Sequence, residues 1–177
     1  MPVSLALTVT GPDKPGLIEA LSSTLATHGA NWQESRLATL GGQFAGIVLT
    51  SVPDDQLEPL QAALDGLCAQ GLTVSTSKGL AVQPLADQRT VRLEMTGQDR
   101  PGILREISHA LVTRGVSIEE LETECLSASW SGEVIFRATA ELWVPADLST
   151  EQLREVLESL GNELMVDITL DETKPAC

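Results

Sequence analysis

Aromatic and basic side chains are scarce in this sequence. Its 177 residues include 2 Phe, 3 Trp and no Tyr, so a folded core has to be built mainly from aliphatic side chains. Only 11 Lys and Arg stand against 25 Asp and Glu, which gives a formal net charge of −14, and no basic cluster interrupts the acidic excess. Such a chain repels a phosphate backbone and anionic lipid alike. We therefore expect no direct binding to nucleic acid or to a membrane.

Long apolar runs are missing as well. The opening MPVSLALTVT has neither the basic segment nor the apolar stretch of a secretory signal. No later stretch approaches the roughly 20 apolar residues that a transmembrane helix needs. These two absences predict a cytoplasmic protein.

Residues that carry chemistry are few and scattered. The three cysteines, Cys68, Cys125 and Cys177, are odd in number and share no metal-ligand spacing, which favours reduced thiols. Neither His28 nor His109 has a partner at the spacing of a metal site or a catalytic triad, and His28 is predicted to have a structural role in a last helical turn. No phosphate-binding loop, dinucleotide fingerprint or nucleophile elbow is present. We therefore predict a protein that is not an enzyme and that has no catalytic residues, metal or cofactor.

An acidic run in the second half of the chain has two interpretations. Its members, Glu119, Glu120, Glu122 and Glu124, could bind a divalent cation or could lie on a solvated sheet face. Because the last three alternate with less polar residues in an extended segment, the run is typical of a strand with one solvated face.

The chain contains an internal repeat. Residues 10–34, TGPDKPGLIEALSSTLATHGANWQE, align without a gap on residues 96–120, TGQDRPGILREISHALVTRGVSIEE, 86 residues later. The identical pairs are Thr10/Thr96, Gly11/Gly97, Asp13/Asp99, Pro15/Pro101, Gly16/Gly102, Ser22/Ser108, Leu25/Leu111, Thr27/Thr113, Gly29/Gly115 and Glu34/Glu120. These matches gather on turn residues, which indicates duplication of a whole module. We predict two domains, at residues 1–83 and 89–172, with a linker at 84–88 and a short tail at 173–177.

Both copies predict the same elements. A strand with alternating apolar residues opens each copy, on Leu5, Leu7 and Val9 and on Val91, Leu93 and Met95. Helical spacing follows on Leu17, Leu21 and Leu25 and on Ile103, Ile107 and Leu111. Pro15 and Pro101 suit the first turn of these helices, and Gly29 and Gly115 suit their ends.

The second half of each copy predicts a hairpin, a helix and a last strand. In the first copy, extended segments at 30–40 and 43–52 flank Gly41-Gly42, and a leucine stripe precedes a strand at 72–82. The second copy has the corresponding segments at 116–126, 133–144 and 164–170. Right-handed crossovers then give an α+β protein of two ferredoxin-like (βαββαβ) modules, each with a four-stranded antiparallel sheet.

The turns G-P-D-K-P-G-L and G-Q-D-R-P-G-I, each between a strand and a helix, resemble the ACT domain, and the resemblance covers nearly the whole chain. Two such modules in tandem resemble the glycine cleavage system transcriptional repressor family, which is similar in turn to the ACT segments of formyltetrahydrofolate deformylases. The resemblance implies that the loop before each first helix binds a small amino acid, often where two ACT sheets lie edge to edge. The residues that match this loop are Gly11, Asp13, Pro15, Gly16 and Leu17, and Gly97, Asp99, Pro101, Gly102 and Ile103. A further family contact, at the start of the second strand, falls on Asn31 in the first copy and Ser117 in the second.

The physical chemistry of the loop agrees with such a ligand. Gly16 and Gly102 have no Cβ, so a carboxylate could approach free backbone N–H groups where the helix dipole favours it. Asp13 or Asp99 and the Asn31 carbonyl could accept from the ligand's ammonium. The alternative is that the aspartates only cap the helices and the glycines only turn the chain.

Two functions follow from this resemblance. The first is an amino-acid-responsive regulator that binds a glycine- or serine-like ligand and modulates a protein partner, a transcription regulator of glycine cleavage or one-carbon metabolism. The alternative is an ACT interaction module without a ligand, which dimerises or docks on a metabolic enzyme. Because sheet edges have to be paired or covered, we expect edge-to-edge association, within one chain or in a homodimer. Because an amide offers more hydrogen bonds than a hydroxyl, Asn31 against Ser117 predicts tighter binding in the first copy.

Overall fold

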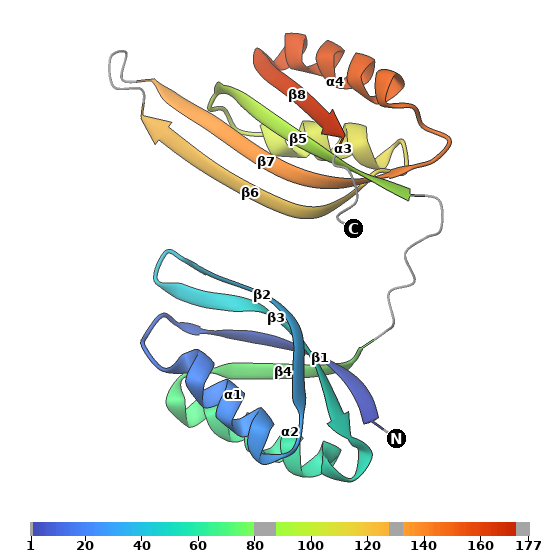
Figure 1. The fold of residues 1–177 in the computed structure, drawn as a ribbon. Coiled ribbons are helices and arrows are strands. Elements are labelled where there is room, and N and C mark those ends of the chain that lie inside the picture. Colours follow the sequence, from blue (N-terminus) through green and yellow to red (C-terminus); the bar gives the residue numbers. More distant parts are fainter. Residues whose placement is uncertain (1, 80–87, 128–132, 173–177) are drawn as a thin grey trace. The chain divides into compact units, whose positions relative to one another are not determined.

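The computed structural model describes residues 2–79, 88–127 and 133–172. The chain forms two compact units, Met1–Val82 (unit one) and Gln83–Cys177 (unit two), and each contains one copy of the repeat (Figure 1). Residues 84–87 of the predicted linker and the predicted tail, 173–177, lie outside the described residues. The predicted ends of the domains therefore stay a prediction.

Unit one consists of four strands and two α-helices. The strands are β1 (Pro2–Pro12), β2 (Asn31–Leu40), β3 (Gln43–Pro53) and β4 (Thr73–Lys78), and they form an antiparallel sheet in the order β2-β3-β1-β4. Helices α1 (Leu17–Thr27) and α2 (Leu57–Gly66) cover one face of this sheet (Figure 1). Short 3₁₀ turns, η1 (Asp54–Gln56) and η2 (Leu67–Gln70), flank α2.

Unit two repeats this architecture. Its strands are β5 (Gln88–Gln98), β6 (Ser117–Ser127), β7 (Val134–Pro145) and β8 (Val166–Glu172), in the order β6-β7-β5-β8. Helices α3 (Ile103–Val112) and α4 (Thr150–Leu164) cover one face (Figure 1). The predicted α+β fold of two ferredoxin-like modules is confirmed.

The predicted aliphatic stripes form a separate core in each unit. In unit one the sheet and α1 contribute side chains that are at most 2% exposed, namely Leu5, Leu7, Val9, Leu21 and Leu25. In unit two the equivalent side chains are equally buried, namely Val91, Leu93, Met95, Ile107 and Leu111. Each such side chain contributes about 1.5–3 kcal/mol when it leaves water.

The end of α1 also follows the prediction. Gly29 has a φ of +64° and follows His28, the C-cap residue of the helix. The Nδ1 atom of His28 lies 2.9 Å from the carbonyl oxygen of Thr24, one turn back along the helix. His28 therefore has the structural role that its position predicted.

The last strands differ from their predicted ranges. The prediction began the final strand of unit two at residue 164, but α4 continues through Leu164 and β8 begins at Val166. The reason is that Leu164 packs in the core from the helix, and Met165, with a φ of +55°, ends α4 in the left-handed conformation. In unit one the predicted strand 72–82 is observed as Thr73–Lys78.

The acidic run lies along β6. The register pairs Glu120 with Glu141 and Glu124 with Arg137, on the face of the sheet opposite to the buried Leu142 and Ala140. Glu120, Glu122 and Glu124 are exposed, so the predicted solvated face is confirmed. Within the described residues no group of three or more His, Cys, Asp and Glu could hold a metal ion, and no helix is long and apolar enough to span a membrane.

Candidate functional site

The two predicted ligand loops connect β1 to α1 and β5 to α3. We call residues 13–16 the first loop and residues 99–102 the second loop. Each ends in a glycine in the left-handed region, Gly16 with a φ of +96° and Gly102 with a φ of +98°. An L-residue is strained at this φ, so these two positions need glycine for the backbone itself.

The glycines, and not the prolines, set where the helices begin. Gly16 and Gly102 are the N-cap residues, and the first helical residues are Leu17 and Ile103. The prediction that Pro15 and Pro101 lie in the first helical turn is therefore wrong. A glycine in the left-handed conformation lies between each proline and its helix, so each proline precedes the N-cap residue.

Among the described residues, no side chain caps α1 or α3. The structure shows no side-chain hydrogen bond at the N-cap of α1 or of α3. The alternative that Asp13 and Asp99 are helix caps is thus wrong. Their backbone N–H groups instead donate to the neighbouring hairpin, from Asp13 to the Gly42 oxygen at 2.9 Å and from Asp99 to the Val134 oxygen at 2.8 Å.

The first-turn N–H groups of α1 are available to a ligand. The first intrahelical bond runs from the Ala20 N–H to the Gly16 oxygen at 2.9 Å, so the N–H groups of Leu17, Ile18 and Glu19 precede the helical ladder. Together they form the positive end of the helix dipole. A Cβ placed on Gly16 would have nothing within 4 Å, so the space in front of this helix start is open.

A cavity of about 310 Å³ lies at this helix start. Its lining is the first loop, the first turn of α1 and two residues of the hairpin, namely Asp13, Lys14, Pro15, Gly16, Leu17, Ile18, Glu19, Thr39 and Phe44. The Asp13 carboxylate accepts a long hydrogen bond of 3.5 Å from the Thr39 hydroxyl, and otherwise faces solvent. The cavity therefore combines an acidic acceptor with free backbone donors.

Not every residue of the predicted loop can touch a ligand through its side chain. Leu17 and Ile103 are 4% and 2% exposed and pack in the cores, so they offer only backbone N–H groups. A Cβ on Gly11 would overlap the Gly71 carbonyl, and one on Gly97 would lie 2.9 Å from the Met165 oxygen. Gly11 and Gly97 thus allow close backbone packing.

Asn31 and Ser117 lie far from their own loops. Asn31 pairs with Ser51 at one end of β3, whereas Thr39, beside the first loop, pairs with Phe44 at the other end. At about 3.4 Å per residue, the two ends are roughly 24 Å apart. Ser117 likewise pairs with Trp143 at the end of β7 remote from the second loop. Within one unit the structure does not bring these residues together with the loop.

An ion pair joins the second loop to the first turn of α3, and the first loop has no equivalent. Arg100 Nη2 lies 3.1 Å from Glu106 Oε2, and Nη1 lies 3.4 Å from Oε1. The aligned residues of the first copy are Lys14 and Ala20, so the pair cannot form there. Sequence reasoning missed this pair, although the gapless alignment contains the signal, a glutamate in the second copy where the first has alanine.

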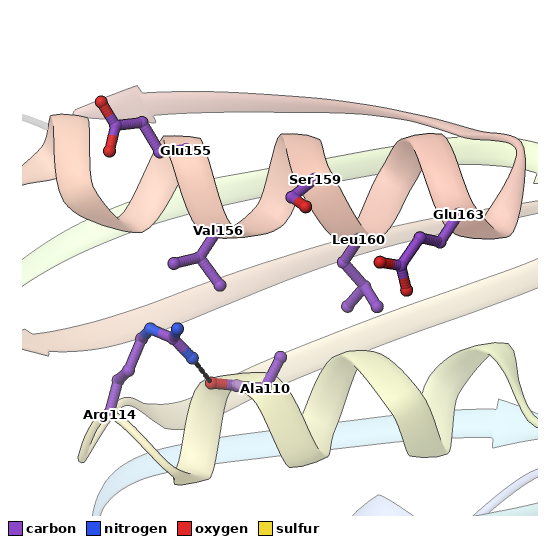
Figure 2. Close-up of a pocket in the computed structure, with 7 residues that line it drawn as sticks. All are labelled: Ala110, Arg114, Glu155, Val156, Ser159, Leu160 and Glu163. Atoms are coloured by element: carbon purple, nitrogen blue, oxygen red, sulfur yellow. Dashed lines mark hydrogen bonds between the residues drawn. The ribbon is translucent and has the colours of Figure 1, made fainter.

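Two further hollows lie on the helices of unit two. One, of about 360 Å³, is a groove between α3 and α4, lined by Ala110, Arg114, Glu155, Val156, Ser159, Leu160 and Glu163. Figure 2 shows Val156 and Leu160 pointing into it from α4, opposite Ala110, while Arg114 donates to the Ala110 oxygen at 3.1 Å. The other, of about 460 Å³, lies along α3 beside Arg105 and His109. The leucine pattern of α4 predicted packing only, so neither hollow was foreseen.

Comparison with known proteins gives the chain its context. A family model described as the ACT domain matches residues 4–77. The glycine cleavage system transcriptional repressor of Escherichia coli strain K12 is 22% identical over 163 residues, which cover 90% of this chain and 85% of the relative.

Solved structures match over the whole chain. The crystal structure of an unknown protein from Galdieria sulphuraria is 34% identical, with a TM-score of 0.87, and the match covers 98% of this chain and 100% of that one. A second structure, provisionally assigned as a glycine cleavage system transcriptional repressor, is 20% identical with a TM-score of 0.72, and covers 98% of this chain and 99% of that one. At that identity the second structure bears on the fold alone.

Proposed function

Because this chain belongs to the ACT-domain family, we propose that it is a regulatory protein that binds a small amino acid, such as glycine or serine, at the first loop. The observation that carries the proposal is the cavity of about 310 Å³ at the start of α1. It holds groups of both signs that a zwitterion needs, in a volume at the lower end of the range for small-molecule pockets.

Each end of an amino acid has a partner in this cavity. The ligand's carboxylate would accept from the N–H groups of Leu17 and Ile18. Its ammonium would donate to the Asp13 carboxylate, which gives a charge-assisted bond. Because Gly16 leaves open space in front of the helix start, the ligand can reach the backbone without a change in the loop.

Asn31 would join the site from a neighbouring module. If two edge strands of the β2 type pair antiparallel, the first residue of one strand lies beside the last residues of the other. If β2 pairs with β2 of a second copy, Asn31 of one copy would approach the first loop of the other. If β2 pairs with β6, within one chain or in a homodimer, Ser117 would approach the first loop instead. This arrangement supports the expected edge-to-edge association, because it completes the ligand site with the residues that one unit keeps apart.

The proposed receiver of the signal is a protein. A chain of net charge −14 would be repelled by DNA, so an effect on transcription requires a partner such as a transcription regulator. The likeness to the Escherichia coli glycine cleavage system transcriptional repressor supports a partner of this kind. From the same likeness to the repressor we propose that the protein is cytoplasmic. We also propose that it has no enzymatic activity of its own.

A second candidate function is an interaction module that needs no ligand. The observation in its favour is the ion pair of Arg100 and Glu106, which links the second loop to α3 without any added molecule. In that case both units would serve only to dimerise or to dock on a metabolic enzyme.

Isothermal titration of the full chain with the twenty amino acids separates the two functions. The proposed sensor gives saturable heat with one or two small amino acids, and Asp13→Asn weakens that binding roughly ten- to a hundredfold, as expected for a lost bond between charged groups. Asp54→Asn is the matched control, because Asp54 is exposed in η1 and outside the cavity lining. No heat with any amino acid would favour the interaction module.

A further inference from the structure

The ion pair of the second loop has a defined position relative to the helix start. Glu106 is the fourth residue of α3, and its side chain turns back toward the N-terminus, as helical side chains do. A Cβ placed on Gly102 would lie 3.6 Å from Glu106 Oε1. The carboxylate therefore lies beside Gly102, where the equivalent space beside Gly16 is open.

Arg100 holds the carboxylate in this position. Its guanidinium contacts both carboxylate oxygens, at 3.1 and 3.4 Å, and both side chains are only partly exposed, at 37% and 42%. Two parallel contacts fix the orientation of a carboxylate better than a single one does. Because Arg100 is paired with Glu106, it is not free to attract another anion.

The first loop has the opposite arrangement. Ala20 replaces the glutamate, and Lys14 is in no ion pair with the residues that the structure describes. The acidic residue in the first turn of α1 is Glu19, and its Oε1 accepts from the Ser23 hydroxyl at 3.1 Å, one turn further along the helix. Among the described residues, no carboxylate lies within 4 Å of a Cβ placed on Gly16.

We propose that Glu106 is a built-in occupant of the second loop, whose carboxylate takes the place that a ligand carboxylate takes in the first. This inference rests on the proposed function. It adds the number of amino acids that each chain binds, and it names Glu106 as the residue that decides this number. A free amino acid would have to displace the Glu106 carboxylate from the position that its ion pair with Arg100 holds. Each chain therefore binds one amino acid, in unit one, and unit two works as a ligand-independent module.

Calorimetric stoichiometry in reciprocal variants of the full chain tests the proposal, with glycine and L-serine as probes. The wild type should bind one ligand per chain, and Glu106→Ala, which recreates the Ala20 arrangement, should bind two. The double variant Lys14→Arg/Ala20→Glu should weaken binding in unit one roughly tenfold or more. Glu158→Ala removes an equal charge from an exposed position of α4 and should leave one site per chain. Two ligands per wild-type chain, or a single one in Glu106→Ala, would overturn the proposal.

A measurement without ligand keeps this proposal separate from the proposed function. If neither probe binds to the wild type, the proposed function fails, and Glu106 is judged from backbone amide spectra of the ligand-free chain. Glu106→Gln should then shift the amide resonances of Ile103 and Leu104, because the charge in front of those N–H groups is lost, whereas Glu158→Gln should not. Unchanged Ile103 and Leu104 resonances would show that the carboxylate does not stand at the helix start.

Discussion

Thr50 gives the sharpest test of how the first core is packed. Its side chain is 0% exposed on β3, between Leu5 and Trp32, and its hydroxyl has no hydrogen-bond partner among the described residues. The second copy has Leu142 at this place in the register. Thr50→Val keeps the shape of the side chain and removes an unsatisfied polar group, so the variant should be more stable.

The size of this effect follows from the cost of a buried, unpaired donor. That cost is about 1–3 kcal/mol, and because Val fills nearly the same volume no cavity offsets the gain. For a unit of this size, each kcal/mol corresponds to a rise of about 4–8 °C in melting temperature. We therefore expect unit one to gain at least about 1 kcal/mol in its free energy of unfolding and to melt several degrees higher.

Urea unfolding followed by amide resonances of β1 reports on unit one alone. The control is Thr76→Val, because the half-buried Thr76 hydroxyl accepts from Gln61 Nε2 at 3.2 Å. This variant loses a hydrogen bond and should be destabilised by roughly 0.5–1.5 kcal/mol. If Thr50→Val lowers the stability as Thr76→Val does, the Thr50 hydroxyl has a partner and the reasoning is refuted.

Three further substitutions test other parts of the structure. Met165→Gly should stabilise unit two by about 1 kcal/mol in thermal unfolding, because Met165 has a φ of +55° and is 74% exposed; an unchanged or lower melting temperature would contradict this. Ser149→Ala should cost about 1 kcal/mol by breaking the capping box with Gln152, and Thr or Asp at the same position should restore most of it; equal stability of all three variants would refute the cap. Asn31→Ala should weaken amino-acid binding roughly ten- to a hundredfold in calorimetry while Ser117→Ala changes it little, and the reverse order would show that Ser117, and not Asn31, reaches the bound amino acid.

The internal repeat made the fold predictable. Turn residues such as Gly41-Gly42 and the alternating strands are local signals, and the duplication repeated each of them in a second context. Helix starts were less predictable, because the left-handed conformation of Gly16 displaced Pro15 from the first turn. The end of α4 was missed for a similar reason, since nothing in the sequence marks Met165 as a left-handed residue.

The site was predictable only where it is local. Asp13, Gly16 and the first-turn N–H groups are neighbours in sequence, and the structure gathers them around one cavity. Asn31 came from the family resemblance, and only the strand register shows that it lies at the other end of β3. The alignment shows that only the second copy has a glutamate at this place, but the contact of Glu106 with Arg100 also depends on side-chain directions that a sequence does not contain.

The central claim is that a small amino acid binds at the start of α1. Titration of the isotopically labelled wild-type chain with glycine and L-serine, followed by backbone amide spectra, tests it most directly. We predict saturable shifts of the Leu17, Ile18 and Glu19 resonances, with those of Ile103 and Leu104 unmoved. Saturable shifts confined to other parts of the chain, such as the groove between α3 and α4, would contradict the claim.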